Sequence, residues 1–345
     1  MNTLDLIVHA LSRRAARPLF RPIMRGRATI FMLHRVTDPT LDVSGHTLEF
    51  VRGALQALRR SGAQFVSVRQ IVDACVNGTV PGHDWVAFTI DDGFADQAMM
   101  AREVFAAESC PVTIFLISDL IDGKLWPWDD QFSYILKKTQ SRQAEVTLGA
   151  ERFKLQLQTP GQRAVALDRL REHCKHACDG NFYGWVGELA RQLDVALPAT
   201  PPPSYRPLTW DQARELESHG VEFGPHSISH RIFSRLSESE ARAEIDQSWR
   251  RLREELAHPL PVFAWPTGRA QDYTERDVQL AREAGLLACA STDPDYAHLD
   301  RTLSSVHGLC SLRRFPLPSR IRDVLQYGSW IERGKQILRK SVPGV

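Results

Sequence analysis

Short apolar runs alternate with amphipathic stretches along most of the chain. The runs 28–33, 85–90 and 112–117 are apolar at nearly every position, which is typical of strands buried on both faces of a parallel sheet. The stretch 48–61 has apolar residues at helical spacing and predicts a helix that ends at Gly62. Later short apolar runs lie at 221–223, 261–265 and 286–290. Strands that alternate with helices predict an α/β protein with parallel strands.

Residues 120–205 do not follow this alternation of strands and helices. Apolar and polar positions alternate on both sides of Gly149, which predicts a hairpin, and helical sequence follows before a proline-rich linker at 198–204. We expect an α+β insertion or cap between two parts of one core domain, with a separate small domain as the alternative. The predicted division is a basic N-terminal segment (1–27), a core domain (28–119 and 206–320), the insertion (120–205) and a basic C-terminal helix (321–345).

Composition excludes several classes of protein. The 345 residues are 43% hydrophobic and 24% charged, as in soluble globular proteins. The 43 Lys and Arg against 41 Asp and Glu give a formal charge of +2, so nothing chain-wide points to nucleic acid as a partner. No apolar run reaches the roughly 18 residues of a membrane span. Six cysteines in so long a chain do not indicate a disulfide scaffold.

The two ends of the chain are basic. At the N-terminus the apolar stretch precedes the arginines, whereas a secretory signal has its positive charge first, so we expect no export signal and a cytoplasmic protein. Two interpretations of the basic termini remain open. They are solvated helical ends, or they make a peripheral contact with the anionic inner face of a membrane.

Polar side chains with metal-binding chemistry follow two of the predicted strands. One group is Thr89-Ile90-Asp91-Asp92-Gly93, and the other is His226-Ser227-Ile228-Ser229-His230. Each alone has an ordinary explanation, a turn for the paired acids and a solvent-exposed loop for the histidines. Because parallel strands present their carboxyl ends at one edge, the two groups together predict a site with two histidines and one carboxylate.

These motifs resemble those of the polysaccharide deacetylase family. Residues 89–93 match its Thr-Phe-Asp-Asp-Gly motif with Ile in place of Phe, and 226–230 match its His-Ser/Thr-x-x-His motif in full. A third motif is recognisable but altered in Phe263-Ala264-Trp265-Pro266-Thr267-Gly268. The resemblance runs from about Thr29 to Pro316 and implies a distorted (β/α) barrel of about seven parallel strands.

The resemblance also implies roles for individual residues. Asp92, His226 and His230 correspond to the ligands of a divalent metal, usually Zn²⁺, and Asp91 to the catalytic base. Zinc lowers the pKa of bound water toward about 7, and a nearby carboxylate takes the proton as hydroxide attacks an acetamide carbonyl. The third motif, with Trp265, lines the substrate site, and its Thr267 N–H corresponds to a donor to the oxyanion.

The chain departs from the family pattern at two points. Ala264 stands where many members have an arginine that orients the base, and Arg313 or Arg314 is our candidate for the missing cation. The late motif that supplies a histidine as general acid has no clean copy, and His307 is the candidate. His34, at the end of the first strand, is predicted either to line the pocket or to bond to backbone.

The sequence therefore predicts a metal-dependent hydrolase of the N-acetyl group of an amino-sugar saccharide, such as one containing N-acetylglucosamine. The expected substrate is a cell-surface polysaccharide, as in exopolysaccharide biosynthesis, or a lipid-linked glycan precursor. Two alternatives remain, a catalytically silent carbohydrate-binding relative and a metal-free glycoside hydrolase with two carboxylates. The second alternative leaves His226 and His230 without a role.

Overall fold

A curled sheet of parallel strands lies at the centre of the computed structural model, which describes all residues except 1–2, 16, 80–83, 178–179, 300–308 and 342–345. Strands β1 (Arg27–Leu33), β3 (Trp85–Asp92), β4 (Thr113–Leu116) and β7 (Glu222–Pro225) are neighbours in this order and run parallel. Nearly all of their residues are buried, as their apolar sequences predict.

Further parallel segments close the sheet into a distorted barrel. The Leu260 N–H donates to the Phe223 carbonyl, which joins β7 to the start of β8 (Val262–Ala264). Strand β8 pairs with β9 (Ala288–Ala290), Ala290 bridges to Leu312, and β11 (Phe315–Pro316) returns to β1. With 312–316 as one segment, the described part of the chain forms a ring of seven parallel segments, which confirms the predicted barrel. Two short strands extend it, β2 (Gln64–Phe65) on β3 and the antiparallel β10 (Ala297–His298) on β1.

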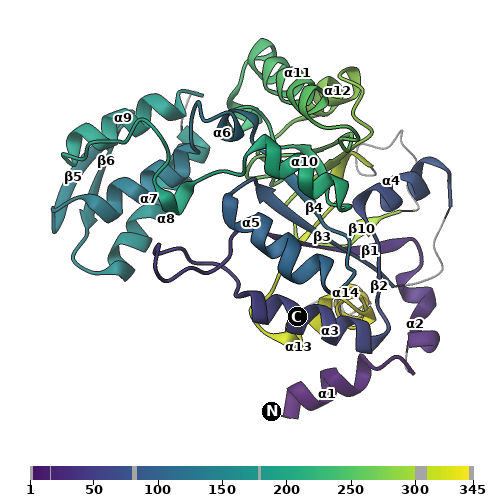
Figure 1. The fold of residues 1–345 in the computed structure, drawn as a ribbon. Helices are drawn as coiled ribbons and strands as arrows, with labels where there is room; N and C mark the ends of the chain where they lie inside the picture. Colours follow the sequence, from purple (N-terminus) through teal and green to yellow (C-terminus); the bar gives the residue numbers. More distant parts are fainter. Residues whose placement is uncertain (1–2, 16, 80–83, 178–179, 300–308, 342–345) are drawn as a thin grey trace.

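Helices connect the strands and cover the outside of the barrel (Figure 1). Those of the barrel are α3 (Leu48–Ser61), α4 (Val68–Val76), α5 (Ala95–Met100) with a π-helical continuation (Ala101–Ala106), α6 (Ser118–Ile121), α10 (Trp210–Ser218), α11 (Glu238–Glu255) and α12 (Glu275–Glu283). Single 3₁₀ turns lie at Pro203–Tyr205, Phe233–Arg235 and Leu309–Ser311.

The predicted ends of the helices are present. Gly62, at φ +90°, ends α3 in the left-handed conformation that glycine adopts without strain. Thr209 and Ser237 each form the capping box predicted from the Gln or Glu three residues later.

The insertion has a hydrophobic core of its own. It contains α7 (Trp128–Lys138), the hairpin β5 (Gln143–Leu148) and β6 (Glu151–Gln156), α8 (Pro160–Ala177) and α9 (Phe182–Gln192). In Figure 1 this lobe, drawn in teal, lies beside the barrel. Trp128 is buried against Phe132 and Phe182, so it belongs to this core as well as to the wall of the site described below.

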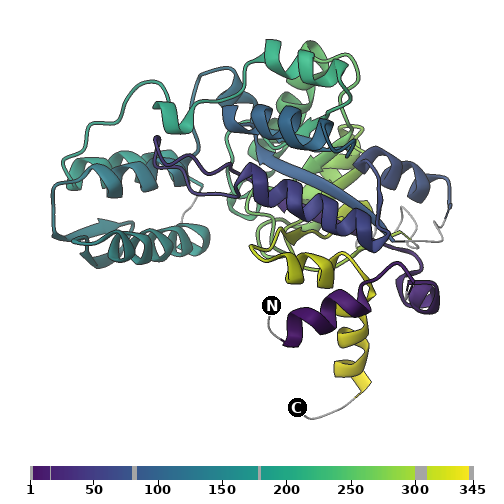
Figure 2. The same ribbon diagram turned by 60° about the horizontal axis from the view of Figure 1, so that its bottom comes forward.

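The terminal helices pack together on a side of the barrel away from the insertion (Figure 2). They are α1 (Thr3–Leu11), α2 (Arg17–Met24), α13 (Ile321–Tyr327) and α14 (Trp330–Ser341). Phe20 stacks on Trp330, and the buried Arg17 pairs with Asp84 at 3.0 Å. The expectation of simply solvated ends is therefore wrong for Arg17. None of the helices in the described residues combines the length and apolar composition that crossing a bilayer requires.

Candidate active site

The two adjacent carboxylates at the end of β3 reach the same cavity. On a regular strand, neighbouring side chains point to opposite faces. Asp92 has φ +90° and Gly93 follows at φ +93°, so the backbone turns sharply after Asp91. As a result both carboxylates line one cavity of about 320 Å³ at the carboxyl end of the barrel. A side chain at Gly93 would collide with Leu116 and Ile121.

The loop after β7 is folded so that both of its histidines face the same point. Ser227 and His230 have φ of +67° and +55°, and the Ser227 hydroxyl accepts a hydrogen bond from the His230 N–H. The buried Glu244 of α11 accepts from the N–H groups of Ile228 and Ser229. Positive φ at residues other than glycine costs free energy, and here it is concentrated where the side chains converge.

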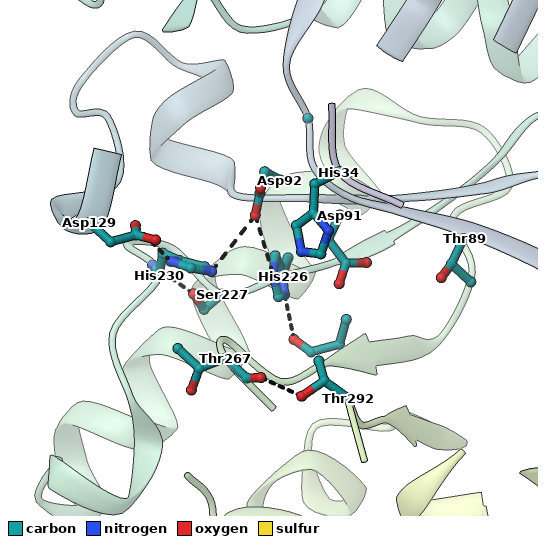
Figure 3. A network of polar contacts seen from close by, with 12 residues as sticks. His34, Thr89, Asp91, Asp92, Asp129, His226, Ser227, His230, Thr267 and Thr292 are labelled. Atoms are coloured by element: carbon teal, nitrogen blue, oxygen red, sulfur yellow. Dashed lines mark hydrogen bonds and ion pairs between the residues drawn. The ribbon is translucent and has the colours of Figure 1, made fainter. Parts of the chain in front are cut away.

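Asp92, His226 and His230 form a group that fits a metal ion. Asp92 Oδ1 lies 3.5 Å from His226 Nε2 and 3.7 Å from His230 Nε2, as Figure 3 shows. One ligand atom from each residue lies within 4.8 Å of the others. The Ala264 carbonyl oxygen lies 2.7 Å from His226 Nδ1, which places the proton there and leaves Nε2 free to bind metal. Two imidazoles and one carboxylate are ligands suited to Zn²⁺ or a related divalent ion.

An acidic residue from the insertion lies behind His230. Asp129 Oδ1 is 3.6 Å from His230 Nδ1, and neither of these buried atoms has a hydrogen-bond partner among the described residues. Burial favours the neutral ring, but the carboxylates of Asp129 and Asp92 outweigh it and raise the pKa of His230 to about 9. A metal ion that bound here would therefore displace a proton.

Electrostatics keep Asp92 ionised. Burial alone would raise its pKa, but the surrounding imidazoles of His226, His34 and His230 hold the pKa of Asp92 well below its ordinary value. The group is thus a carboxylate at neutral pH, the form that binds a metal ion.

Asp91 is held by a buried arginine. Arg314 donates from its two Nη atoms to the two carboxylate oxygens of Asp91, at 2.7 and 2.8 Å. It also donates to the Thr89 hydroxyl and the Ser291 carbonyl. Burial works to raise the pKa of Asp91, but the Arg314 charge, followed by those of His226 and His34, holds that pKa below its ordinary value. Of the two candidate arginines, Arg314 contacts Asp91, the predicted base, while Arg313 pairs with Asp295.

Residues of the third motif also line the cavity. Thr267 has φ +55°, and its hydroxyl donates to Asp272, which also accepts from the Arg269 N–H. Among the described residues, no group accepts a hydrogen bond from the Thr267 N–H. Trp265 is fully buried and stacks on Tyr273, yet it also lines the cavity.

Of the two histidine candidates outside the metal group, the structure describes only one. His34 is exposed and lines the cavity beside Asp91 and Asp92 (Figure 3). Its carbonyl, rather than its ring, accepts a hydrogen bond from Gln97. His307 lies outside the described residues, so its predicted role as general acid stays a prediction.

Sequence reasoning missed the contribution of the insertion to this site. Trp128 Nε1 donates to the His230 carbonyl at 3.0 Å, and the Tyr183 hydroxyl donates to the Ser229 carbonyl at 2.8 Å. Together with Asp129, these residues attach α7 and α9 to the histidine loop. No spacing in the sequence could show this, because the contacts depend on how the lobe packs against the barrel.

Comparison with known proteins agrees with this geometry. The sequence model described as polysaccharide deacetylase matches residues 79–288, well over half of the chain. This range contains the motifs at Asp91, His226 and Thr267 but ends before Arg314. YxkH of Bacillus subtilis strain 168, which is named as a polysaccharide deacetylase, is 26% identical over 101 residues. That match spans 29% of this chain and only 35% of YxkH.

Solved structures share the fold at low sequence identity. The Streptococcus pyogenes deacetylase PplD, in complex with acetate, superposes with a TM-score of 0.56 at 16% identity, covering 88% of this chain and 98% of PplD. IcaB from Ammonifex degensii gives a TM-score of 0.55 at 15% identity, covering 88% and 97%. These likenesses establish the barrel architecture, and the sequence match over residues 79–288 establishes the kinship. The chain belongs to the polysaccharide deacetylase family.

Proposed function

We propose that this protein is a metal-dependent carbohydrate N-deacetylase that hydrolyses the N-acetyl group of an amino-sugar saccharide. One observation carries the proposal. The ligand atoms of Asp92, His226 and His230 converge within 4.8 Å beside Asp91, a separate carboxylate held by Arg314. A site with three metal ligands and a free base is the arrangement that hydrolysis of an amide needs.

The metal would be held by Asp92, His226 and His230, and Zn²⁺ is the ion we propose. When bound in such a site, a divalent ion lowers the pKa of water toward about 7 and polarises a carbonyl oxygen. The donor set supports this assignment, because Asp92 is ionised and His226 presents an unprotonated Nε2.

The chain's own residues supply the remaining chemistry. Asp91, ionised at neutral pH, accepts a proton from the water that attacks the acetamide carbon. Arg314 fixes the orientation of the Asp91 carboxylate through two hydrogen bonds. The Thr267 N–H, free among the described residues, would donate to the oxyanion that develops. The amine then leaves with a proton from a general acid, for which His307 stays the predicted donor.

The family relationship supports the substrate class that we propose. A cell-surface polysaccharide or a lipid-linked precursor that contains N-acetylglucosamine is the substrate we propose. A silent carbohydrate-binding relative would not need a base held in place by a buried arginine. A metal-free glycoside hydrolase would not need two imidazoles aimed at one carboxylate.

Acetate release from a panel of N-acetylated saccharides, with and without chelator, tests the proposal. We expect release by the wild type, its loss on chelation, and its return with Zn²⁺. Asp91→Asn should retain metal but lose activity by about 100-fold or more, whereas His226→Ala should lose both. Asp168→Asn, an exposed change on α8, is the matched control and should behave as wild type. Turnover that survives both chelation and Asp91→Asn would refute the proposal.

We also propose a peripheral contact between the terminal helices and an anionic membrane surface, with the protein in the cytoplasm. Exposed large apolar side chains gather on these helices, at Leu6, Ile7, Leu11, Leu19, Ile337 and Leu338. The same helices carry arginines and lysines, and apolar and basic side chains together are typical of helices that lie on anionic lipid.

A further inference from the structure

Part of the wall of the candidate cavity is made of cationic side chains. Arg171 and Lys175 line it from α8 of the insertion, and Arg269 lines it from the loop of the third motif. Met32, His34 and Pro316, near the ends of β1 and β11, also line this cavity. Two of these three cations therefore come from the insertion, and the third comes from the third motif.

Most acidic residues that line the cavity already interact with partners other than its cationic side chains. Asp91 is paired with Arg314, and Asp92 faces the two histidines that complete the metal group. Of the described residues that line the cavity, Asp129 is the one carboxylate from the insertion, and it lies 3.6 Å from Arg171 and equally far from His230. The three cations of this wall thus outnumber the carboxylates that could neutralise them.

The cationic groups retain hydrogen-bonding capacity. The Arg269 side chain is exposed and makes no hydrogen bond or ion pair with any described residue. Lys175 pairs with Glu172 three residues away, an exposed contact of the kind that contributes little. The Nε of Arg171 is buried and has no hydrogen-bond partner within the described parts of the chain. Because this atom is buried, Arg171 would offer a ligand its charge and the exposed part of its side chain, which is 28% exposed overall.

We propose that this wall binds an anionic group, a phosphate or a carboxylate, that the substrate carries next to its N-acetylated sugar. The inference rests on the proposed deacetylase function and narrows its substrate class to anionic saccharides. Guanidinium and ammonium groups bind such anions through charge-assisted hydrogen bonds, the strong kind. The anion could be the phosphate of a lipid-linked or nucleotide-linked sugar, or the carboxylate of a neighbouring uronic acid.

Matched substrates test this proposal. One N-acetylated disaccharide is prepared as a neutral glycoside, as the 1-phosphate, and with glucuronic acid as the neighbouring sugar. Acetate release gives kcat/KM for each, and calorimetry gives the Kd of each without requiring turnover. We expect at least one anionic form to be bound and cleaved about tenfold better than the neutral form. That advantage should shrink as NaCl is raised from 50 to about 500 mM.

Substitutions of the cationic side chains test whether these residues cause the preference for anionic substrates. Arg269→Gln and Lys175→Gln should each reduce the preference for the anionic form by about threefold or more, mainly through KM and Kd. Arg169→Gln is the matched control, because Arg169 lies on the same helix α8 but outside this cavity. It should leave the preference as in the wild type.

The outcomes separate this inference from the proposed function. Equal Kd and kcat/KM for all three forms would overturn the inference while the deacetylase assignment stands. A preference that Arg269→Gln and Lys175→Gln both leave unchanged would overturn it too. Tighter binding of an anionic form with no acetate released would support the anion site and count against the deacetylase. Whether the phosphate or the glucuronate is preferred identifies the source of the anion.

Discussion

Arg314 and Asp91 form a buried two-point ion pair, although 223 residues separate them in the chain. The last parallel segment of the barrel, 312–316, brings Arg314 beside the end of β3. Arg314 thus occupies the position of a base-orienting cation in a chain that has Ala264 where many relatives have arginine. We treat it as a positioning residue, because it contacts Asp91, the proposed base.

Arg314→Lys should lower kcat by about tenfold or more and change KM little. A lysine keeps the charge but cannot hold both carboxylate oxygens, so Asp91 would lose its fixed orientation. Steady-state kinetics on a folded variant, checked by near-UV circular dichroism, measures this. Arg314→Ala should also destabilise the fold, by about 3–5 kcal/mol, because it leaves the buried Asp91 charge without its partner.

Arg313→Ala is the natural control for this pair of variants. Its side chain is 40% exposed and contacts Asp295, whereas the side chain of Arg314 is fully buried. It should retain wild-type kcat and lose little stability. If Arg314→Lys and Arg313→Ala both turn over at the wild-type rate, Arg314 has no positioning role.

The surroundings of Asp91 show which parts of the site the sequence could predict and which it could not. The paired acids and the paired histidines were recognisable because each directly follows an apolar run, and parallel strands bring their ends together. The sequence could not decide which of Arg313 and Arg314 contacts Asp91, because this depends on the register of the short segment 312–316. Neighbouring residues on a strand face opposite sides, so a shift by one would have exchanged them.

Asp129→Asn should weaken metal binding by about tenfold or more. The Asp129 carboxylate lies 3.6 Å from His230 Nδ1, and its charge increases the basicity of the ring, whereas an amide carries no charge. Competition with a chromogenic chelator measures the affinity without reference to activity. Asp168→Asn, on the exposed face of α8, should leave the affinity unchanged. Equal metal affinities for Asp129→Asn and wild type would show that Asp129 of the insertion does not affect metal binding by Asp92, His226 and His230.

Asp129 was not predictable from the sequence. It lies in Trp128-Asp129-Asp130, at the start of an amphipathic helix in an insertion outside the matched motifs. Acidic residues in the first turn of a helix are common, since they complement its dipole. Only the packing of the insertion against the histidine loop distinguishes Asp129 from such residues, and hydrophobic periodicity does not encode that packing.

Asp130→Asn should stabilise the chelated protein increasingly as the pH rises. Burial, followed by the charges of Asp129 and Asp92, raises the pKa of Asp130 to about 8, against about 4 in an unfolded chain. Between these values the folded protein keeps a proton that the unfolded chain has lost. Raising the pH therefore favours unfolding, by at most about 1.4 kcal/mol per pH unit.

Urea unfolding of the chelated wild type and of Asp130→Asn at pH 5 to 9 checks this dependence. The difference in free energy of unfolding should grow from pH 5 to about pH 8 and then level off, because both states of the wild type are deprotonated above that pH. Asp168→Asn should show no trend. A difference that stays constant with pH would mean that Asp130 is already ionised in the folded protein.

Leu19→Asp and Leu338→Asp should each weaken binding to anionic vesicles if the terminal helices contact a membrane. These side chains are 78% and 67% exposed, so the changes remove apolar surface and add repulsive charge without disturbing the packed core. Co-sedimentation with vesicles that contain phosphatidylglycerol measures the bound fraction, and neutral vesicles should bind less. Val165→Asp, 61% exposed on α8 of the insertion, adds the same charge away from the terminal helices and should leave binding unchanged. Equal losses from all three substitutions would indicate that net charge alone decides the binding, and the assignment of a membrane-facing surface to these helices would be wrong.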